Sequence, residues 1–250
     1  MSKGRLEGKV AVVTGASKGI GAGIARALAA HGASVVVNYA GSQAGADTVV
    51  GQITQAGGKA VAVQADVSKA ADVKRLFAEG QKAFGRLDVL VNNAGVYNFA
   101  SAQDNSEEEY RRQFDINVLG PLLTVREALP HFGEGGGSII NISSVVSRLG
   151  FPGASIYSGT KGALDSISLA FAQELAGRNI RVNVVAPGMV ESEGTHAAGV
   201  IENMAPGVIA KTPLGRIGQP DDIAGIVTFL ASDDSRWVTG ERIQAAGGYQ

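Results

Sequence analysis

The sequence predicts a single α/β domain built on a doubly wound parallel sheet. Short apolar segments alternate with helical segments along the chain, an order that produces βαβ units with helices on both faces, in a three-layer αβα arrangement. The apolar segments are near-continuous runs of Val, Ile and Ala, so both faces of each strand are expected to be buried, as in a parallel sheet. Because no linker or repeat interrupts the 250 residues, one domain covering 1–250 is expected.

The segment 9–64 contains a complete βαβαβ unit, the half of a doubly wound sheet that binds a nucleotide. Glycine follows a helical pattern at His31-Gly32 and at Gly57-Gly58, which indicates helix ends, because glycine readily adopts the left-handed conformation found there. The expected strands are 9–14, 34–39 and 60–64, and the expected helices are 19–30 and 44–56.

The alternation of strands and helices continues to the end of the chain. Pro121 lies inside one long helical pattern and is expected to kink it, because proline lacks the backbone N–H that an interior position donates. A less regular region is expected over 190–219. The expected strands are 89–92, 138–143, 181–186 and 242–245, and the expected helices are 71–84, 107–132, 220–231 and one that carries Tyr157 and ends near 177.

Charge and composition argue against several classes of partner. The formal net charge is -1, so the chain offers no basic field for nucleic acid or anionic lipid. No run approaches the roughly 18 apolar residues of a membrane span, and the first residues lack the apolar core of a signal peptide. The absence of cysteine excludes disulfides and fits a reducing compartment, so a cytoplasmic protein is expected. Since His31, His131 and His196 are widely scattered, no metal site is predicted.

A glycine-rich turn, Thr14-Gly15-Ala16-Ser17-Lys18-Gly19-Ile20-Gly21, connects the first strand to the first helix. Without a Cβ the backbone can approach a pyrophosphate closely, and a helix N-terminus offers unpaired N–H groups and the positive end of its dipole. The spacing is Gly-x3-Gly-x-Gly rather than the common Gly-x-Gly-x2-Gly. Its position between a strand and a helix nevertheless indicates dinucleotide binding.

The residues after the second strand favour NADP over NAD. An acidic side chain there would accept a hydrogen bond from the adenosine 2'-hydroxyl and would repel a 2'-phosphate. This chain reads Asn38-Tyr39-Ala40-Gly41-Ser42, with no acid before Asp47. Lys18 in the glycine turn adds a cation that could reach a phosphate, although it could also be simply solvated in a permissive site.

Two further strand ends carry candidate cofactor contacts. Asp66-Val67 ends the third strand, where an adenine ring would lie, although Asp66 could equally cap the next helix through Ser68. Asn92-Asn93-Ala94-Gly95 ends the fourth strand with small residues that permit close approach of the backbone. A simple loop turn is the alternative interpretation of that stretch.

Tyr157 and Lys161 are four residues apart in a predicted helix, which places them on one face, one turn apart. A neighbouring ammonium favours the ionised form of a phenol, so Lys161 is expected to lower the pKa of Tyr157 from about 10 toward the range of efficient acid/base catalysis. Ser144 ends the fifth strand, where its hydroxyl could polarise a carbonyl oxygen beside that phenol. By spacing alone, Ser143 and Ser147 are competitors for that role.

In combination these motifs resemble those of the short-chain dehydrogenase/reductase family over essentially the whole chain. The resemblance implies a Rossmann-type sheet of seven strands and a catalytic tetrad, and it assigns the serine position to Ser144. The motifs that carry it are Thr14 to Gly21, Asn92 to Gly95, Asn117, Ser144, Tyr157 with Lys161, and Pro187-Gly188. The implied tetrad is Asn117, Ser144, Tyr157 and Lys161.

The resemblance also implies a role for each member of the tetrad. Tyr157 would exchange a proton with the carbonyl or alcohol oxygen, and Ser144 would hold that oxygen. Lys161 would lower the pKa of the phenol and bind the nicotinamide ribose, while Asn117 would hold a water that links Lys161 to solvent. The hydride would come from the cofactor, so the protein contributes positioning and electrostatics.

The loop Pro187-Gly188-Met189-Val190-Glu191-Ser192 resembles the nicotinamide-side loop of the family, with Ser192 in place of the usual threonine. Because a hydroxyl is retained, its contact with the cofactor is expected to be retained as well. The predicted cofactor contacts are Gly15, Ser17, Lys18, Gly19, Ile20, Gly21, Asn38, Tyr39, Ala40, Ser42, Asp66, Val67, Asn93, Ala94, Gly95, Tyr157, Lys161, Pro187, Gly188, Val190 and Ser192.

Three functions are compatible with this pattern. The first is an NADP(H)-dependent oxidoreductase for a neutral ketone, aldehyde or secondary alcohol, with a substrate lid at about 189–216 that carries no cluster of cations. The second is a 3-oxoacyl carrier-protein reductase, but 131–137 contains Glu134 and no Lys or Arg to dock an acidic carrier, which leaves only Arg178. The third is a non-catalytic NADP-binding regulator, against which the intact tetrad argues. The resemblance further implies a homotetramer.

Overall fold

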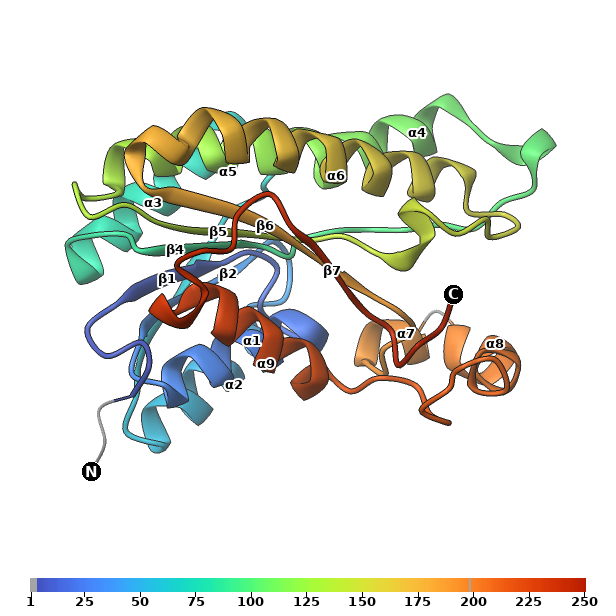
Figure 1. The fold of residues 1–250 in the computed structure, drawn as a ribbon, viewed down its shortest axis with the longest axis horizontal. Coiled ribbons are helices and arrows are strands. Elements are labelled where there is room, and N and C mark those ends of the chain that lie inside the picture. Colours follow the sequence, from blue (N-terminus) through green and yellow to red (C-terminus); the bar gives the residue numbers. More distant parts are fainter. Residues whose placement is uncertain (1–3, 198) are drawn as a thin grey trace.

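Seven parallel strands form the centre of the molecule, in the order β3-β2-β1-β4-β5-β6-β7 (Figure 1). The computed structural model describes residues 4–197 and 199–250. The strands are β1 (Val10–Val13), β2 (Ser34–Tyr39), β3 (Lys59–Gln64), β4 (Val89–Asn92), β5 (Gly137–Ile142), β6 (Ile180–Pro187) and β7 (Arg242–Ala245). After β3 at one edge the chain crosses to β4 beside β1, and this crossing confirms the predicted doubly wound sheet.

Helices cover both faces of the sheet, which confirms the three-layer arrangement (Figure 1). One layer contains α1 (Gly19–Ala30), α2 (Gln43–Gln55) and α9 (Pro220–Ala231). The other contains α3 (Ala70–Phe84), α5 (Gly120–Ala128) and α6 (Ser155–Leu175), with α4 (Glu107–Phe114) packed beside α6.

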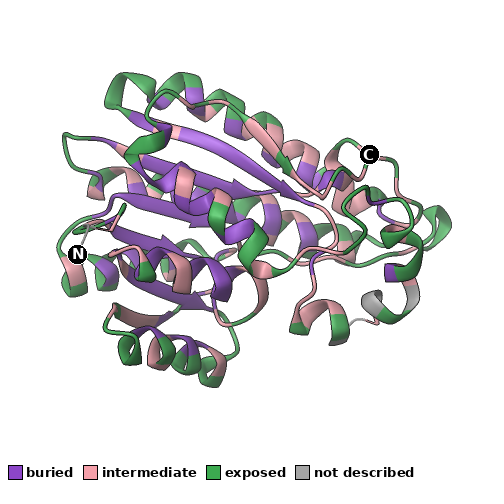
Figure 2. Ribbon diagram, turned by 60° about the horizontal axis from the view of Figure 1, so that its bottom comes forward, coloured by how far each residue is buried: buried purple, intermediate pink, exposed green. Residues whose placement is uncertain are grey.

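Each helical layer shares an apolar core with one face of the sheet, and the strand residues divide between the two cores by alternation. In β1, Ala11 and Val13 pack with the α1 and α9 side, including Leu28. Val12 packs with the opposite layer, including Leu76 of α3. The inner strands, β1, β2, β4, β5 and β6, are therefore buried on both faces (Figure 2), which explains why their sequences are continuous apolar runs. The edge strands β3 and β7 are only partly buried.

The helical stretch that follows β4 differs from its prediction. Between α4 and α5 lies one π-helical segment, Asp115–Leu119, and a short 3-10 helix, Leu129–His131, follows α5. Pro121 is in the first turn of α5, directly after the π segment, so the predicted helix is interrupted next to this residue, and a kink there stays a prediction. The π segment itself contains Asn117.

The region predicted as irregular, 190–219, contains two short helices, α7 (Glu193–Ala197) and α8 (Val200–Ile209). Its two ends are joined by an isolated bridge between Val190 and Gly218, so this segment leaves the sheet and returns to it at nearly the same point. Figure 1 shows α7 and α8 side by side, next to the C-terminus. Among the residues that the structure describes, no helix is both long and apolar enough to span a membrane.

Candidate active site

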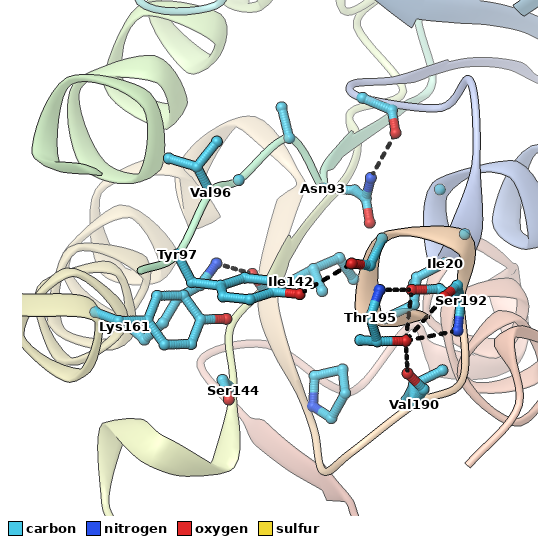
Figure 3. A pocket seen from close by; sticks show the side chains of 18 of the residues that line it. Ile20, Asn93, Val96, Tyr97, Ile142, Ser144, Lys161, Val190, Ser192 and Thr195 are labelled. Atoms are coloured by element: carbon cyan, nitrogen blue, oxygen red, sulfur yellow. Dashed lines mark hydrogen bonds between the residues drawn. The ribbon is translucent and has the colours of Figure 1, made fainter. Parts of the chain in front are cut away.

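A cavity of about 630 Å³ lies at the carboxyl ends of the strands, between the two helical layers and the 190–219 segment. Three members of the predicted tetrad, Ser144, Tyr157 and Lys161, line it. All the predicted cofactor contacts also line it, except Tyr39. Figure 3 shows Tyr97, Ser144 and Lys161 on one side of the cavity and Ile20, Ser192 and Thr195 on the other.

Tyr39, a predicted cofactor contact, does not line the cavity. It is 8% exposed and packs in the core beneath α1 and α2, because strand alternation directs it away from the face that Asn38 occupies. Asn38 lines the cavity, but its side chain is tied to the protein. Its Oδ1 accepts from Gly15 N–H at 3.1 Å, and its Nδ2 donates to the carbonyls of Val63 and Ala65. Asn38 therefore fixes the shape of the glycine turn.

The glycine turn has the conformation that the absence of a Cβ permits. Gly15 and Gly19 have φ of +61° and +57°, in the left-handed region that other residues rarely adopt. A Cβ at Gly21 would lie 2.4 Å from Nδ2 of Asn93, which itself donates to the carbonyls of Thr14 and Gly15. The two small-residue loops thus pack directly on each other and form one wall of the cavity.

The N–H of Gly19, at the start of α1, donates to Glu193 Oε2 at 2.9 Å. Glu193 begins α7, so a carboxylate from the 190–219 segment occupies a backbone donor of the kind that binds pyrophosphate. Replacing this charge should strengthen binding of an anionic cofactor, since like charges 4 Å apart repel by about 1 kcal/mol even in water.

We therefore expect Glu193→Gln to lower the dissociation constant for NADPH by roughly threefold to fivefold. Titration of the quenching of protein fluorescence, or of the nicotinamide emission, would measure the change. Glu202→Gln is the matched control, because it removes a carboxylate from the same segment, where Glu202 pairs with His196 instead. Equal dissociation constants for wild type and Glu193→Gln would contradict the expectation.

The carboxylate of Asp66 is already engaged at the end of β3. Its Oδ1 accepts hydrogen bonds from the backbone N–H and the hydroxyl of Ser68, at 3.0 and 2.6 Å. Burial raises the pKa of this carboxyl, but these hydrogen bonds and the neighbouring Lys69 ammonium together hold the pKa below its usual range. The contact with Ser68 is therefore present, but it does not cap α3, whose N-cap residue is Lys69 and has no side-chain cap hydrogen bond. Asp66 still lines the cavity, as Val67 does.

Tyr157 and Lys161 face the same end of the cavity. Lys161 Nζ lies 5.7 Å from the centre of the Tyr157 ring and donates to the carbonyl of Ile142 at 2.9 Å. The expected lowering of the phenol pKa is not found. Burial raises the pKa of Tyr157 to about 12, and the opposing hydrogen bond with Ser144 is weaker in effect. Burial also lowers the pKa of Lys161 to about 8, and Asp165 acts in the opposite direction.

These shifts give a pH dependence with a defined sign. The lowered pKa of Lys161 means that its ammonium is present below about pH 8 and is lost as the pH rises through that value. That charge would stabilise the phenolate formed when Tyr157 gives up its proton. We therefore expect kcat/KM for NADPH in ketone reduction, which reports the ionisation of the free enzyme, to fall above about pH 8. In Lys161→Arg, whose side chain stays charged, this alkaline decrease should be absent. A wild-type profile that stays flat into the strongly alkaline range would contradict the assignment.

Asn117 does not line the cavity but joins the elements that do. Its Oδ1 accepts from Val96 N–H at 2.8 Å, and its Nδ2 donates to the carbonyl of Val96 and to the hydroxyl of Thr160. A Cβ at Gly95 would lie 3.3 Å from Asn117 Oδ1 and 3.5 Å from Lys161 Nζ. Asn117 therefore holds the loop after β4 against α6, next to the ammonium.

A buried ion pair supports Ser144 and was not found by sequence reasoning. Arg242 of β7 donates through Nε to Asp165 Oδ2 at 2.8 Å, and through Nη2 to the carbonyl of Ser144 at 3.1 Å. The hydroxyl of Ser147 donates to the same carboxylate and accepts from Arg242. A partial signal was available, since Asp165 continues the four-residue spacing of Tyr157 and Lys161 along one helix face.

Ser192, which replaces the family's usual threonine, retains a hydroxyl at the cavity wall. Its Oγ accepts from Thr195 N–H at 3.2 Å, and the hydroxyl of Thr195 accepts from Ser192 N–H at 2.9 Å (Figure 3). This reciprocal pair begins α7 and keeps the loop after β6 against the cavity. Among the described residues, no cluster of three His, Cys, Asp or Glu could hold a metal ion.

Comparison with known proteins agrees with this geometry over the whole chain. Residues 15–250 match the family model described as "Enoyl-(Acyl carrier protein) reductase". An uncharacterized oxidoreductase of Methylorubrum extorquens is 65% identical, over 98% of each chain, and elsinochrome reductase 1 of Elsinoe fawcettii is 42% identical, over 96% of this chain and 94% of that protein. The solved structure of LugOII, a promiscuous reductase that catalyses keto-reduction at C1 during lugdunomycin biosynthesis, superposes with a TM-score of 0.92 at 42% identity, over 98% of this chain and 99% of that one.

The chain belongs to the short-chain dehydrogenase/reductase family. It is therefore an oxidoreductase of a family that uses a nicotinamide cofactor, NAD or NADP, with small-molecule substrates.

Proposed function

We propose that this protein is an NADP(H)-dependent reductase of neutral ketones or aldehydes, with Tyr157 as the general acid/base. The observation that carries the proposal is the convergence of Ser144, Tyr157 and Lys161 at one end of a cavity whose other end is the glycine turn. The relatives named as reductases, and the keto-reduction named for LugOII, support the same direction of reaction.

The cavity walls fit an extended anionic dinucleotide. A Cβ at Gly15 would lie 2.8 Å from Ala94 Cα, and a Cβ at Gly21 would meet Asn93, so side chains are excluded where the backbone must face the cofactor. The N-terminus of α1 would bind the pyrophosphate, and Lys161 would bind the nicotinamide ribose. When bound, the nicotinamide supplies or accepts the hydride.

The remaining steps belong to side chains of this chain. Ser144 would donate a hydrogen bond to the carbonyl oxygen and hold it beside the phenol. Tyr157 would give its proton to that oxygen as negative charge develops there. Because burial raises its pKa to about 12, it stays protonated well above neutral pH. The ammonium of Lys161 would then stabilise the phenolate until a proton returns from solvent.

NADP is the preferred dinucleotide in this proposal. The residues after β2 that line the cavity are Ala40, Gly41 and Ser42, none of them acidic, and Lys18 is exposed at the start of α1. A 2'-phosphate would therefore meet a cation and a hydroxyl rather than a carboxylate.

For the alternative of a 3-oxoacyl carrier-protein reductase, the charges of residues 131–137 and Arg178 are not informative. Residues 131–137 and Arg178 precede β5 and β6, so they lie at the amino ends of these strands, opposite the cavity. Their charges therefore say nothing about docking at the mouth of this chain's own site. No basic group lines the substrate end besides Lys161, among the described residues, and a small neutral substrate remains the better fit.

The test is a panel of ketones, aldehydes, sugars and acyl thioesters, each assayed with NADPH and with NADH at the nicotinamide absorbance. We expect reduction of neutral ketones, with a clear preference for NADPH that Lys18→Ala diminishes. Reduction of thioesters alone would favour the carrier-protein alternative. NADPH binding without oxidation by any member of the panel would favour a non-catalytic regulator.

We also propose a homotetramer, with the 189–216 segment of each subunit acting as its substrate lid. An interface on the outer layer of helices is supported by exposed apolar side chains there, namely Tyr110 on α4, Leu122 on α5 and Leu169 on α6. Ala170 is exposed on the same helix, whereas Ala172 is buried in the core. Light scattering coupled to size-exclusion chromatography would measure the mass in solution.

A further inference from the structure

Four aromatic side chains form a row along the substrate end of the cavity. Tyr97 and Phe99 come from the loop after β4, Phe151 from the loop before α6, and Tyr157 from α6 itself. Ring centres are 5.7 Å apart for Tyr157 and Tyr97, 5.5 Å for Tyr97 and Phe99, and 5.7 Å for Phe99 and Phe151. We call these residues the aromatic row. It leads from the proposed proton donor to the protein surface.

The aromatic row is not part of either apolar core of the fold. Tyr97, Phe99 and Phe151 belong to neither of the two core clusters, and Phe99 is 38% exposed. An exposed phenylalanine that belongs to a continuous apolar surface usually marks a binding site. The row is held in place at its centre, because the hydroxyl of Tyr97 donates to the carbonyl of Gly194 in α7 at 3.4 Å.

The remaining walls at this end are also apolar and uncharged. They include Leu149 on the side of the row and Met204 and Val208 of α8 in the lid. Among the described residues that line the cavity, the charged ones are Lys18, Asp66 and Lys161. Lys18 and Asp66 follow β1 and β3 at the cofactor end, and Lys161 belongs to the tetrad. A substrate anion would therefore find no partner beyond the tetrad.

We propose that the substrate is a neutral, flat ketone whose carbonyl-bearing ring is fused to an aromatic ring, and that the aromatic row binds the aromatic ring. This inference rests on the proposed reductase function. Offset or tilted stacking of rings at separations of about 4.5–7 Å is favourable, and the spacing of the row lets one fused-ring substrate contact more than one of its members. The carbonyl carbon gains a hydride from the reduced nicotinamide, its oxygen gains the proton of Tyr157, and the product is a secondary alcohol.

Two bicyclic ketones of the same size separate an aromatic preference from simple apolar binding. In 2-tetralone a benzene ring is fused to the ring that carries the ketone, whereas 2-decalone has the same skeleton with no aromatic ring. We expect wild-type kcat/KM to be about tenfold or more higher for 2-tetralone, since stacking adds to the burial of area that both ketones share.

The double variant Phe99→Leu/Phe151→Leu keeps an apolar wall but removes two rings. We expect it to reduce the ratio of the two kcat/KM values to within about twofold of unity. Phe84→Leu, at the end of α3, is the matched control and should keep the wild-type ratio, because Phe84 lies outside the cavity. If the double variant is unstable, the single change at the exposed Phe99 gives the same test.

Equal kcat/KM values for both ketones in wild type would overturn the aromatic preference and leave the reductase function standing. If neither ketone is reduced, the binding of 2-tetralone and of 2-decalone to NADPH-loaded Tyr157→Phe protein decides the question by calorimetry. Preferential binding of 2-tetralone that is lost in the double variant would support the aromatic row without turnover. Absence of that preference would refute the row, and the absence of turnover would count separately against the reductase function.

Discussion

Tyr157→Phe is expected to lower kcat/KM for ketone reduction by about 10²–10⁴-fold, the usual contribution of a general acid. The hydroxyl that this change removes is the proposed proton donor, and the ring that remains still packs against Tyr97. Binding of NADPH should change little, because the contacts of the glycine turn and of Lys161 are untouched. Steady-state rates at the nicotinamide absorbance and an independent NADPH titration provide the two measurements.

Tyr157 would donate its proton as a neutral phenol. Burial raises its pKa from about 10 to about 12, so it stays protonated well above neutral pH. The Ser144→Ala variant separates donation from orientation, since it keeps the phenol and removes the hydroxyl that holds the substrate oxygen. A Tyr157→Phe enzyme with more than a tenth of wild-type kcat/KM would show that the proton comes from elsewhere.

The fold could be predicted from sequence because its signals are local. Continuous apolar runs such as Val10–Val13 and Ser34–Tyr39 indicate strands buried on both faces, and the glycines that follow α1 and α2 indicate where these helices end. The π segment at Asp115–Leu119 could not be predicted, because it depends on how Asn117 bonds to Val96 and Thr160, which are distant in sequence. Pro121 marked the place of the interruption, directly after the π segment, but not its π-helical form.

The candidate site, too, could be predicted from the sequence only in part. The glycine turn could be predicted because Gly15 and Gly21 lie within a few residues of each other in the sequence. The raised pKa of Tyr157 could not be predicted, because it arises from burial in the folded protein. The Tyr157–Lys161 spacing correctly predicted that the two groups would lie together, but not which effect would dominate the pKa. The pairing of Asp165 with Arg242 joins positions 77 residues apart, so it becomes visible only when β7 lies beside β6.

Arg242→Met should cause the largest loss of stability among single changes near the site. The ion pair with Asp165 is almost fully buried, with side chains 8% and 13% exposed, and Oδ1 of Asp165 has no hydrogen-bond partner. Removing the guanidinium leaves a buried carboxylate without its counter-charge, which typically costs about 3–5 kcal/mol. For a chain of this length that corresponds to a decrease in Tm of roughly 10 °C, measurable by calorimetry or circular dichroism.

A double variant tests whether the unpaired charge, rather than lost packing, is the cause. Arg242→Met combined with Asp165→Leu removes both charges, so we expect it to recover much of the free energy of unfolding that Arg242→Met loses. Arg126→Met is the surface control: its pair with Glu127 leaves the Arg126 side chain 58% exposed, and the expected loss is below about 1 kcal/mol.

The double variant should nevertheless reduce ketones more slowly than wild type, because Arg242 Nη2 also holds the carbonyl of Ser144. Restored stability with full activity would show that this contact does not position Ser144, whereas restored stability with a lower kcat would separate the two roles of Arg242.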